Sequence, residues 1–287
     1  MGRYVENLGV RIWTQSFGSR ADKAILLISG AMAPAIFWNS NFCERLADLG
    51  YFVLRFDSRD IGDSTHFPPA RDADTDPPYT IDEMVDDVRA ILADHDLNTV
   101  VLIGHSLGST VAQLFAVKYP ERVEKLFLMS SPIIATGNNI YAETDSETLA
   151  AMWQVLMSNK MYPDYKRGKE EFFKVWRYLN GSFELDTDLA DEYTKRLYET
   201  EVIEPAYNHT KVQVGIDDTW TELSELEIPI HFIYGEKDQL ASNVGNIQIL
   251  ANSLPNGHLT VLKGAGHMYF HRRIWQQILS VLTEALA

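Results

Sequence analysis

The chain has 287 residues, of which 46% are hydrophobic and 23% charged, and its formal net charge at pH 7 is −15. This acidic balance argues against nucleic acids and anionic membranes as partners, because both attract clustered Lys and Arg. No apolar stretch approaches the roughly 18 to 20 residues that span a bilayer. Residues 1–10 lack the layout of a signal peptide, and the one cysteine, Cys43, allows no intramolecular disulfide, so we expect a cytoplasmic protein.

The first half of the chain alternates between strand-like and helix-like segments. Short apolar runs such as AILLIS (24–29) and YFVLRF (51–56) are typical of buried strands, and amphipathic segments separate them. The sequence Thr80-Ile81-Asp82-Glu83 is a capping box, which predicts the start of a helix. The predicted elements are a hairpin over 3–15, strands over 24–29, 51–56, 100–104 and 123–130, and helices over 38–50, 80–95 and 109–120.

The alternation breaks after Pro132. Residues 133–222 are helical in pattern, acidic and rich in aromatic side chains, and they contain no convincing strand pattern. Strand-like and helix-like segments then return. The remaining predicted elements are strands over 228–235 and 258–262 and an amphipathic helix over 272–286.

Together these elements predict an α/β fold, in which helices cover both faces of a mostly parallel sheet. The insertion divides the chain into a core domain over 1–132 and 223–287 and a helical cap, or lid, over 133–222. Aromatic side chains of the cap either line an apolar pocket or pack the cap helices against one another. These residues are Trp153, Tyr162, Tyr165, Phe172, Phe173, Trp176, Tyr178 and Phe183.

The most specific motif is G-x-S-x-G in residues 99–108, TVVLIGHSLG, where an apolar run meets a helix pattern. A sharp turn between strand and helix lifts the Ser106 hydroxyl to the carboxyl edge of a sheet. Gly104 and Gly108 suit this turn because strand and helix approach too closely there for a side chain. The motif predicts that Ser106 is the nucleophile of a serine hydrolase.

A serine hydroxyl needs a base to become a nucleophile at neutral pH, and the base needs a carboxylate to orient it. In enzymes built on this turn, the chain order is Ser, acid, His. Asp238 follows the strand over 228–235, and His267 follows the strand over 258–262. Both loops leave the sheet at the edge where ligands bind in open α/β folds. We predict Asp238 as the acid and His267 as the base.

Other residues near these positions have weaker claims. Glu236 is the alternative acid, because it lies in the same loop as Asp238. His105, next to the nucleophile, is expected to pack and form hydrogen bonds beneath the turn rather than act as the base. His271 lies close enough to His267 in the sequence to require a control substitution.

Stabilising the oxyanion of a tetrahedral intermediate requires two preorganised N–H groups. Leu107 is expected to supply one, because it directly follows the nucleophile. The second is expected from the loop after the strand over 24–29, where we select Ala31 and leave its neighbour Met32 open. Gly30 would allow the backbone of this loop to bend toward the substrate.

Three segments resemble the α/β-hydrolase superfamily and, within it, the branch of anthracycline methyl esterases that includes aclacinomycin methylesterase. They are LLISGAMAPAIFW (26–38), RFDSRDIGDST (55–65) and GHSLGSTVAQLFA (104–116). The resemblance extends over nearly the whole chain. It implies the fold of that superfamily, with the nucleophile, acid and base at Ser106, Asp238 and His267.

The resemblance also implies a structural role for residues 55–65, as a loop beside the sheet edge. Two positions depart from the pattern of the superfamily or branch: Ser29-Gly30 stands where His-Gly is frequent, and Leu107 stands where Met is frequent. Neither change removes a backbone donor, so the expected chemistry is retained. The residues expected to shape the loop are Asp57, Arg59, Gly62 and Ser64.

These observations predict a carboxylic-ester hydrolase that forms an acyl-enzyme on Ser106 and acts on a small to medium, largely apolar small molecule. Neither cofactor nor metal is expected, because CxxC, HExxH and dinucleotide-binding motifs are absent from the sequence. Other triad chemistry stays open: a proline-iminopeptidase-like enzyme, a lactonase, a C–C hydrolase or a perhydrolase. An aminopeptidase would need acidic groups to hold a free amine, such as Glu143, Glu147 or Glu204. A small-molecule receptor without turnover is the alternative from another class, and the oligomeric state, monomer or homodimer, also stays open.

Overall fold

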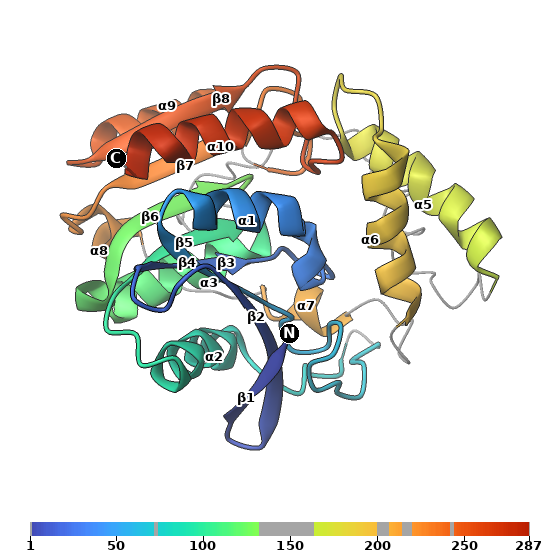
Figure 1. Ribbon diagram of the computed structural model, residues 1–287, viewed down its shortest axis with the longest axis horizontal. Coiled ribbons are helices and arrows are strands. Elements are labelled where there is room, and N and C mark those ends of the chain that lie inside the picture. The colour runs from blue at the N-terminus through green and yellow to red at the C-terminus, as the bar shows by residue number, and fades with distance from the viewer. Residues whose placement is uncertain are drawn as a thin grey trace.

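The computed structural model describes residues 2–71, 74–131, 164–199, 207–213, 220–241 and 244–286. These residues form one eight-stranded sheet in the order β1-β2-β4-β3-β5-β6-β7-β8 (Figure 1). The pairs β1/β2 and β2/β4 are antiparallel, and the other five pairs are parallel. The expected mostly parallel α/β sheet is therefore confirmed.

The strands agree with the predicted segments to within one or two residues at most ends. They are β1 (Arg3–Asn7), β2 (Val10–Phe17), β3 (Lys23–Ile28), β4 (Tyr51–Phe56), β5 (Val100–His105), β6 (Val123–Met129), β7 (Ile230–Gly235) and β8 (Gly257–Leu262). The described helices are α1 (Ser40–Asp48), α2 (Ile81–Asp94), α3 (Leu107–Lys118), α5 (Tyr165–Leu179), α6 (Thr187–Glu199), α7 (Tyr207–Lys211), α8 (Trp220–Ser224), α9 (Val244–Ser253) and α10 (Arg272–Leu286).

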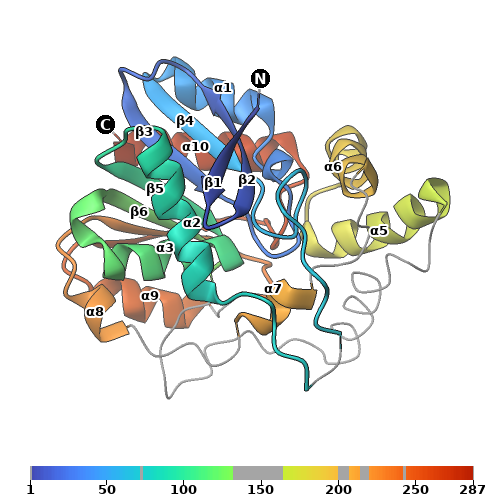
Figure 2. The same ribbon diagram turned by 90° about the horizontal axis from the view of Figure 1, so that it is seen from below.

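Central strands of this sheet are buried on both faces, which explains their continuous apolar sequences. Along β3, Leu26 and Ile28 pack in a cluster with residues of α2, α3 and α9. The alternate residues Ile25 and Leu27 pack in a second cluster with residues of α1 and α10. Figure 2 shows these two groups of helices on opposite sides of the sheet. The two cores fix the carboxyl ends of the parallel strands at one common edge.

Side-chain caps define where two of the helices begin. Thr80 Oγ1 accepts the N–H of Glu83, and Glu83 Oε2 accepts the N–H of Thr80 at 2.9 Å, which confirms the predicted capping box of α2. The helix α1 begins at Ser40, later than expected, because Asn39 Oδ1 accepts the N–H of Phe42 at 2.9 Å. A short 3-10 turn over Ala35–Phe37 precedes this cap.

One described helix of the core, α9, has no counterpart among the predicted elements. Its sequence, VGNIQILANS, combines glycine, asparagine and β-branched residues, all of which have modest helix propensity. Ile247 and Ala251 of α9 are buried in the core. Packing against the sheet therefore stabilises a helix that local preferences do not indicate.

The described part of the predicted cap includes α5 and α6, which Figure 1 shows on one side of the sheet. The junction between them is tied to the loop that follows β8. The carbonyl of Leu179 accepts the N–H of Met268 at 3.0 Å, and Asn180 Oδ1 accepts the N–H of Phe270 at 2.9 Å. The loop after β8 is thus supported from the side of α5 and α6.

Several aromatic side chains of the predicted cap pack its helices against one another. Trp176 stacks on Phe172 with ring centroids 5.4 Å apart and meets Tyr193 of α6 edge-on at 5.5 Å. Trp176 Nε1 also donates to Thr194 Oγ1 at 3.0 Å. Two of the aromatic residues singled out in the sequence, Trp153 and Tyr162, lie outside the described residues.

The division into core and cap stays a prediction. Its second boundary, between 222 and 223, falls within α8, whose Leu223 is buried in the same core as α3. The acidic residues Glu143, Glu147 and Glu204 also lie outside the described part of the chain. Among the described helices, none combines the length and the apolar character needed to cross a bilayer.

Candidate active site

Ser106 occupies a strained turn between the end of β5 and the start of α3. Its φ of 51° and ψ of −122° lie in a region that residues other than glycine rarely adopt. Surrounding hydrogen bonds hold this conformation: Ser106 N donates to the carbonyl of Met129 at 2.9 Å, and the Ser106 carbonyl accepts Ser109 N at 2.8 Å. The sequence therefore forms the predicted strand, sharp turn and helix.

The two glycines of the motif are required by close backbone contacts. A Cβ atom on Gly104 would lie 2.4 Å from the carbonyl oxygen of Gly108. A Cβ atom on Gly108 would lie 2.2 Å from the carbonyl oxygen of Ile28 at the end of β3. The expectation that β5 and α3 pack too closely there for a side chain is thus confirmed.

Asp238 and His267 meet at the carboxyl ends of β7 and β8. His267 Nδ1 lies 3.0 Å from both carboxylate oxygens of Asp238, and both side chains are buried. Asp238 Oδ1 also accepts the N–H groups of Leu240 and Ala241, each at 2.9 Å. Burial disfavours the carboxylate, but His267 and these hydrogen bonds outweigh that effect and lower the pKa of Asp238 to about 2.

His105 lies beneath this pair, as the sequence indicated. Its ring is 5.0 Å from the ring of His267, and its Nε2 lies 2.8 Å from the His267 carbonyl oxygen, to which it donates as a neutral imidazole. Burial, reinforced by the neighbouring His267, lowers the pKa of His105 to about 3. His105 therefore supports the backbone of the His267 loop and stays uncharged at neutral pH.

The described contacts contain no direct hydrogen bond between Ser106 and His267. The turn at Ser106 nevertheless lies against the His267 loop, because His105 directly precedes Ser106 and its ring packs at a tilt against the ring of His267. In ligand-free enzymes, hydrogen bonds of this kind often form fully only when substrate is bound.

The sequence did not indicate one residue that stabilises the Asp238 carboxylate, Ser130. Ser130, at φ 47° just after β6, forms a side-chain hydrogen bond that helps to lower the pKa of Asp238. Ser130 Oγ also lies 2.9 Å from the hydroxyl of Tyr269, two residues beyond His267. The available signal was topological, because β6 lies between β5 and β7 in the sheet.

The weaker candidates make other contacts. Glu236 Oε2 accepts the N–H of Gly264 at 3.0 Å. His271 Nδ1 accepts the N–H of Arg273 at 3.1 Å, and its ring packs on Phe183 with centroids 4.9 Å apart. Among the described residues, Asp238 is the carboxylate that contacts His267, so the geometry favours it over Glu236.

We expect Asp238→Asn to lower kcat by about 10³- to 10⁴-fold, because an amide cannot stabilise the imidazolium and favours the wrong tautomer of His267. Glu236→Gln is the matched control, since it removes a carboxylate from the same loop without touching His267. The check is kcat on a p-nitrophenyl ester for both variants. A large loss in Glu236→Gln with a small loss in Asp238→Asn would reverse the assignment.

The loop after β3 lies directly against the nucleophile turn. A Cβ atom on Gly30 would lie 3.1 Å from Ser106 Cβ and 3.3 Å from the carbonyl oxygen of His105. This loop therefore lies close enough to Ser106 to supply the second oxyanion donor, whose identity stays a prediction.

Hydrogen bonds in this loop distinguish Ala31 from Met32. Met32 N donates to His209 Nδ1 at 3.1 Å, and Ala33 N donates to the Gly30 carbonyl at 3.2 Å. For Ala31 N, the described residues offer no acceptor. The Met32 amide is thus occupied while the Ala31 amide is available, which favours Ala31 as the donor that accompanies Leu107.

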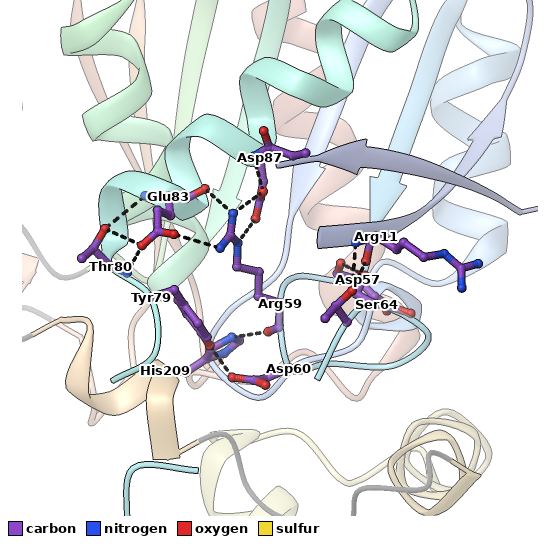
Figure 3. Close-up of polar contacts among 12 residues, drawn as sticks. Arg11, Asp57, Arg59, Asp60, Ser64, Tyr79, Thr80, Glu83, Asp87 and His209 are labelled. Carbon is purple, nitrogen blue, oxygen red and sulfur yellow. Dashed lines mark hydrogen bonds and ion pairs between the residues drawn. The ribbon is translucent and has the colours of Figure 1, made fainter. Parts of the chain in front are cut away.

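Residues 57–64 shape the neighbouring loop. The carboxylate of Asp57 accepts the N–H groups of Ala35 at 2.7 Å and Asp63 at 3.0 Å, which ties the loop after β4 to the loop after β3. Ser64 Oγ donates to the Asp57 carbonyl (Figure 3). Gly62 adopts a φ of 58°, and a Cβ atom there would lie 2.0 Å from Asp57 Oδ2. These contacts agree with the structural role implied for this segment.

In the described part of the chain, no group of three or more His, Cys, Asp or Glu side chains could hold a metal ion. The arrangement instead provides a nucleophile turn, a buried acid and base, and backbone donors at one sheet edge. A family model described as the alpha/beta hydrolase fold matches residues 23–273. The chain belongs to the α/β-hydrolase family.

Within this α/β-hydrolase family, the chain is similar to two characterised proteins over most of its length. It is 28% identical to rhodomycin D methylesterase DnrP of Streptomyces peucetius, covering 92% of this chain and 91% of that protein. It is 27% identical to rhodomycin D methylesterase DauP of Streptomyces sp. (strain C5), covering 90% and 89%. These relatives confirm the resemblance to anthracycline methyl esterases and support the predicted class, carboxylic-ester hydrolases.

A comparison with solved structures gives the same fold. The 2-hydroxy-6-oxo-6-phenylhexa-2,4-dienoate hydrolase of Rhodococcus sp. strain RHA1 matches with a TM-score of 0.75 at 17% identity, covering 100% of this chain and 98% of that one. A putative aryl esterase from Burkholderia cenocepacia matches with a TM-score of 0.74 at 19% identity, covering 100% and 99%. At these identities the structural similarity establishes the fold but gives no evidence about the reaction, which must be inferred from the site residues.

Proposed function

We propose that this protein hydrolyses carboxylic esters through an acyl-enzyme on Ser106. One observation carries the proposal: Ser106 is held at φ 51°, where β5 ends and α3 begins, on the sheet edge that also carries the hydrogen-bonded pair Asp238 and His267. The two relatives that are methylesterases support an ester rather than another acyl substrate.

In the first half of the reaction, Ser106 Oγ attacks the ester carbonyl while His267 Nε2 takes its proton. Asp238 holds His267 Nδ1–H and stabilises the imidazolium that forms. The N–H groups of Leu107 and Ala31 stabilise the oxyanion of the tetrahedral intermediate. His267 then gives its proton to the departing alcohol, and water repeats the sequence to release the acid.

The substrate that we propose is an ester of a small alcohol with a larger, largely apolar acid. Similarity to two methylesterases supports the small alcohol. We also propose a cytoplasmic location, which the single buried cysteine supports. A chain with one cysteine forms no intramolecular disulfide, as is usual in a reducing compartment. Burial raises the pKa of Cys43 to about 12, so this thiol is also unreactive.

A fluorophosphonate probe tests the nucleophile directly, because it bonds only to an activated serine. We expect one adduct by intact mass, located by peptide mass spectrometry to Ser106 and absent from Ser106→Ala. Turnover of methyl and p-nitrophenyl esters of increasing acyl length then measures the acyl pocket. A labelled protein that cleaves amides or lactones but no ester would contradict the ester assignment. Absence of both labelling and turnover would contradict the nucleophile.

A further inference from the structure

His209 in α7 connects the loop after β3 with the loop after β4. Its side chain is fully buried, and its Nδ1 accepts the N–H of Met32 at 3.1 Å. Its Nε2 lies 2.7 Å from the carbonyl oxygen of Arg59 (Figure 3). An imidazole that accepts at Nδ1 must carry its proton on Nε2, so Nε2–H donates to Arg59 and the ring is neutral. Burial lowers the pKa of His209, which favours the same neutral form.

The Met32 amide lies in a strained turn of the loop after β3. Met32 has a φ of 59°, a left-handed conformation that is unfavourable for a residue other than glycine. The hydrogen bond from Ala33 N to the Gly30 carbonyl closes a four-residue turn with Met32 as its third residue. Turns with a left-handed third residue differ from the common type I turn by a rotation of their central peptide, here the one joining Ala31 and Met32.

Rotating that peptide would relieve the strain at Met32, but it would turn the Met32 N–H away from His209. The acceptor nitrogen of His209 therefore opposes the rotation. It holds the Ala31–Met32 peptide in the strained form and thereby fixes the turn over residues 30–33. The Ala31 N–H belongs to the preceding peptide of this turn, Gly30–Ala31, and has no acceptor among the described residues. An unpaired, fixed donor beside Ser106 is what an oxyanion hole requires.

His209 is itself rigidly held. Its neighbour Asn208 donates from Nδ2 to Asp60 Oδ2 at 2.8 Å and accepts the N–H of Ala70 at 2.9 Å. Tyr79 donates to the same Asp60 oxygen at 2.7 Å, and its ring packs edge-on against His209. These contacts fix α7 to the loop after β4, so His209 has a defined position from which to orient Met32.

We propose that His209 is a positioning residue of the oxyanion hole: it holds the Met32 N–H and so anchors the turn over residues 30–33, whose preceding peptide, Gly30–Ala31, presents the Ala31 N–H to the developing oxyanion. This inference rests on the proposed function, because it assumes an acyl transfer at Ser106. His209 touches neither the nucleophile nor the base in the described contacts. Its effect would therefore appear in the stabilisation of the transition state rather than in substrate binding.

Three substitutions separate positioning from general support of the fold. His209→Leu removes both hydrogen bonds. His209→Asn keeps an acceptor near the position of Nδ1, and His209→Gln keeps a donor near the position of Nε2 but offers Met32 no acceptor. Thr210→Ala is the matched control, because it removes a hydrogen bond within the same helix, from Thr210 Oγ1 to the Tyr207 carbonyl, and leaves the contacts of His209 in place.

The readouts are kcat and KM for p-nitrophenyl butyrate, with active sites counted by fluorophosphonate titration. We expect His209→Leu and His209→Gln to lower kcat per titrated site by about 10- to 100-fold, somewhat less than removal of a whole oxyanion donor. We expect KM to change by less than about threefold, because ground-state binding is retained. His209→Asn should recover most of the lost kcat, and Thr210→Ala should lower the melting temperature while leaving kcat per site within about threefold of wild type.

A trifluoromethyl ketone gives a second readout, because Ser106 adds to it and creates a stable oxyanion. Its affinity should fall in parallel with kcat in the leucine and glutamine variants, and recover in the asparagine variant. If the leucine variant does not fold, the comparison of asparagine with glutamine decides. Equal kcat in these two variants, or wild-type kcat in His209→Leu, would overturn the role of His209. An unlabelled, inactive wild-type protein would instead overturn the proposed function itself.

Discussion

Ser106→Ala and His267→Gln are each expected to lower kcat for ester hydrolysis by about 10⁴- to 10⁶-fold, and the double variant is expected to be no worse than either. Alanine has no nucleophilic oxygen, and the glutamine amide cannot take the proton of Ser106. Either change alone removes the same step, so their free-energy costs do not add. The measurement is kcat and kcat/KM for the wild type, both single variants and the double variant.

The chain supplies matched controls for this pair. His271→Gln removes a histidine four residues from His267, whose described contacts are with Arg273 and Phe183, and it should leave kcat within about threefold of wild type. Ser109→Ala removes a buried hydroxyl that donates to the Gly104 carbonyl beneath the turn, and its loss should appear mainly in stability. Multiplicative losses in the double variant would mean that Ser106 and His267 act in separate steps.

The candidate triad could be found in the sequence because each member directly follows a strand of the parallel sheet. Strand patterns are local, and parallel strands end at one edge, so three distant segments converge once the sheet is recognised. The turn at Ser106 is equally local, since Gly104 marks the close contact of β5 with α3 and Gly108 marks the close contact of α3 with the end of β3.

Contacts of the supporting residues could not be found in the same way. Met32 and His209 are 177 residues apart, and Ser130 and Tyr269 are 139 residues apart. No periodicity pairs such residues, because their contact depends on how α7 and the loops pack rather than on local propensity. The helix α9 was missed for the related reason that packing of Ile247 outweighs a weak local preference.

Residues 55–65 could be predicted from the sequence only in part. The segment resembled a family motif, and a structural role followed from that resemblance, but its partners did not. Arg59 binds Asp87 in α2, with Nε 2.6 Å from Oδ2 and Nη2 2.9 Å from Oδ1 (Figure 3). Asn7 at the end of β1 donates to the same carboxylate at 2.7 Å. The motif thus joins the amino-terminal hairpin, α2 and the loop after β3 through buried polar contacts.

Asp87→Ala is expected to lower the free energy of unfolding by about 3–5 kcal/mol, because it removes the buried carboxylate that binds Arg59 and leaves this buried guanidinium only the longer contact with the exposed Glu83, at 3.4 Å. The side chains of Arg59 and Asp87 are both 3% exposed, so solvent cannot replace the lost carboxylate. The control is Asp94→Ala, which breaks an ion pair with Arg3 whose side chains are 44% and 39% exposed, and should cost about 0–1 kcal/mol. Urea unfolding of both variants measures the difference. Equal costs would contradict the buried-pair argument.

Replacing both partners should cost much less than replacing one. Burial raises the pKa of Asp87 even though contacts with Arg59 and Asn7 lower it. Desolvation therefore disfavours the Asp87 carboxylate more than these two partners stabilise it. Arg59→Met with Asp87→Leu removes both buried charges together, and such exchanges are often neutral or stabilising. We therefore expect the double variant to be more stable than Asp87→Ala. His209 Nε2 contacts the backbone carbonyl of Arg59, which substitution of the Arg59 side chain does not remove. The double variant should therefore keep the hydrogen bond between His209 and residue 59, and most of the wild-type kcat. A double variant that is stable but inactive would mean that the Arg59 side chain, and not only its backbone carbonyl, orients the loop after β3.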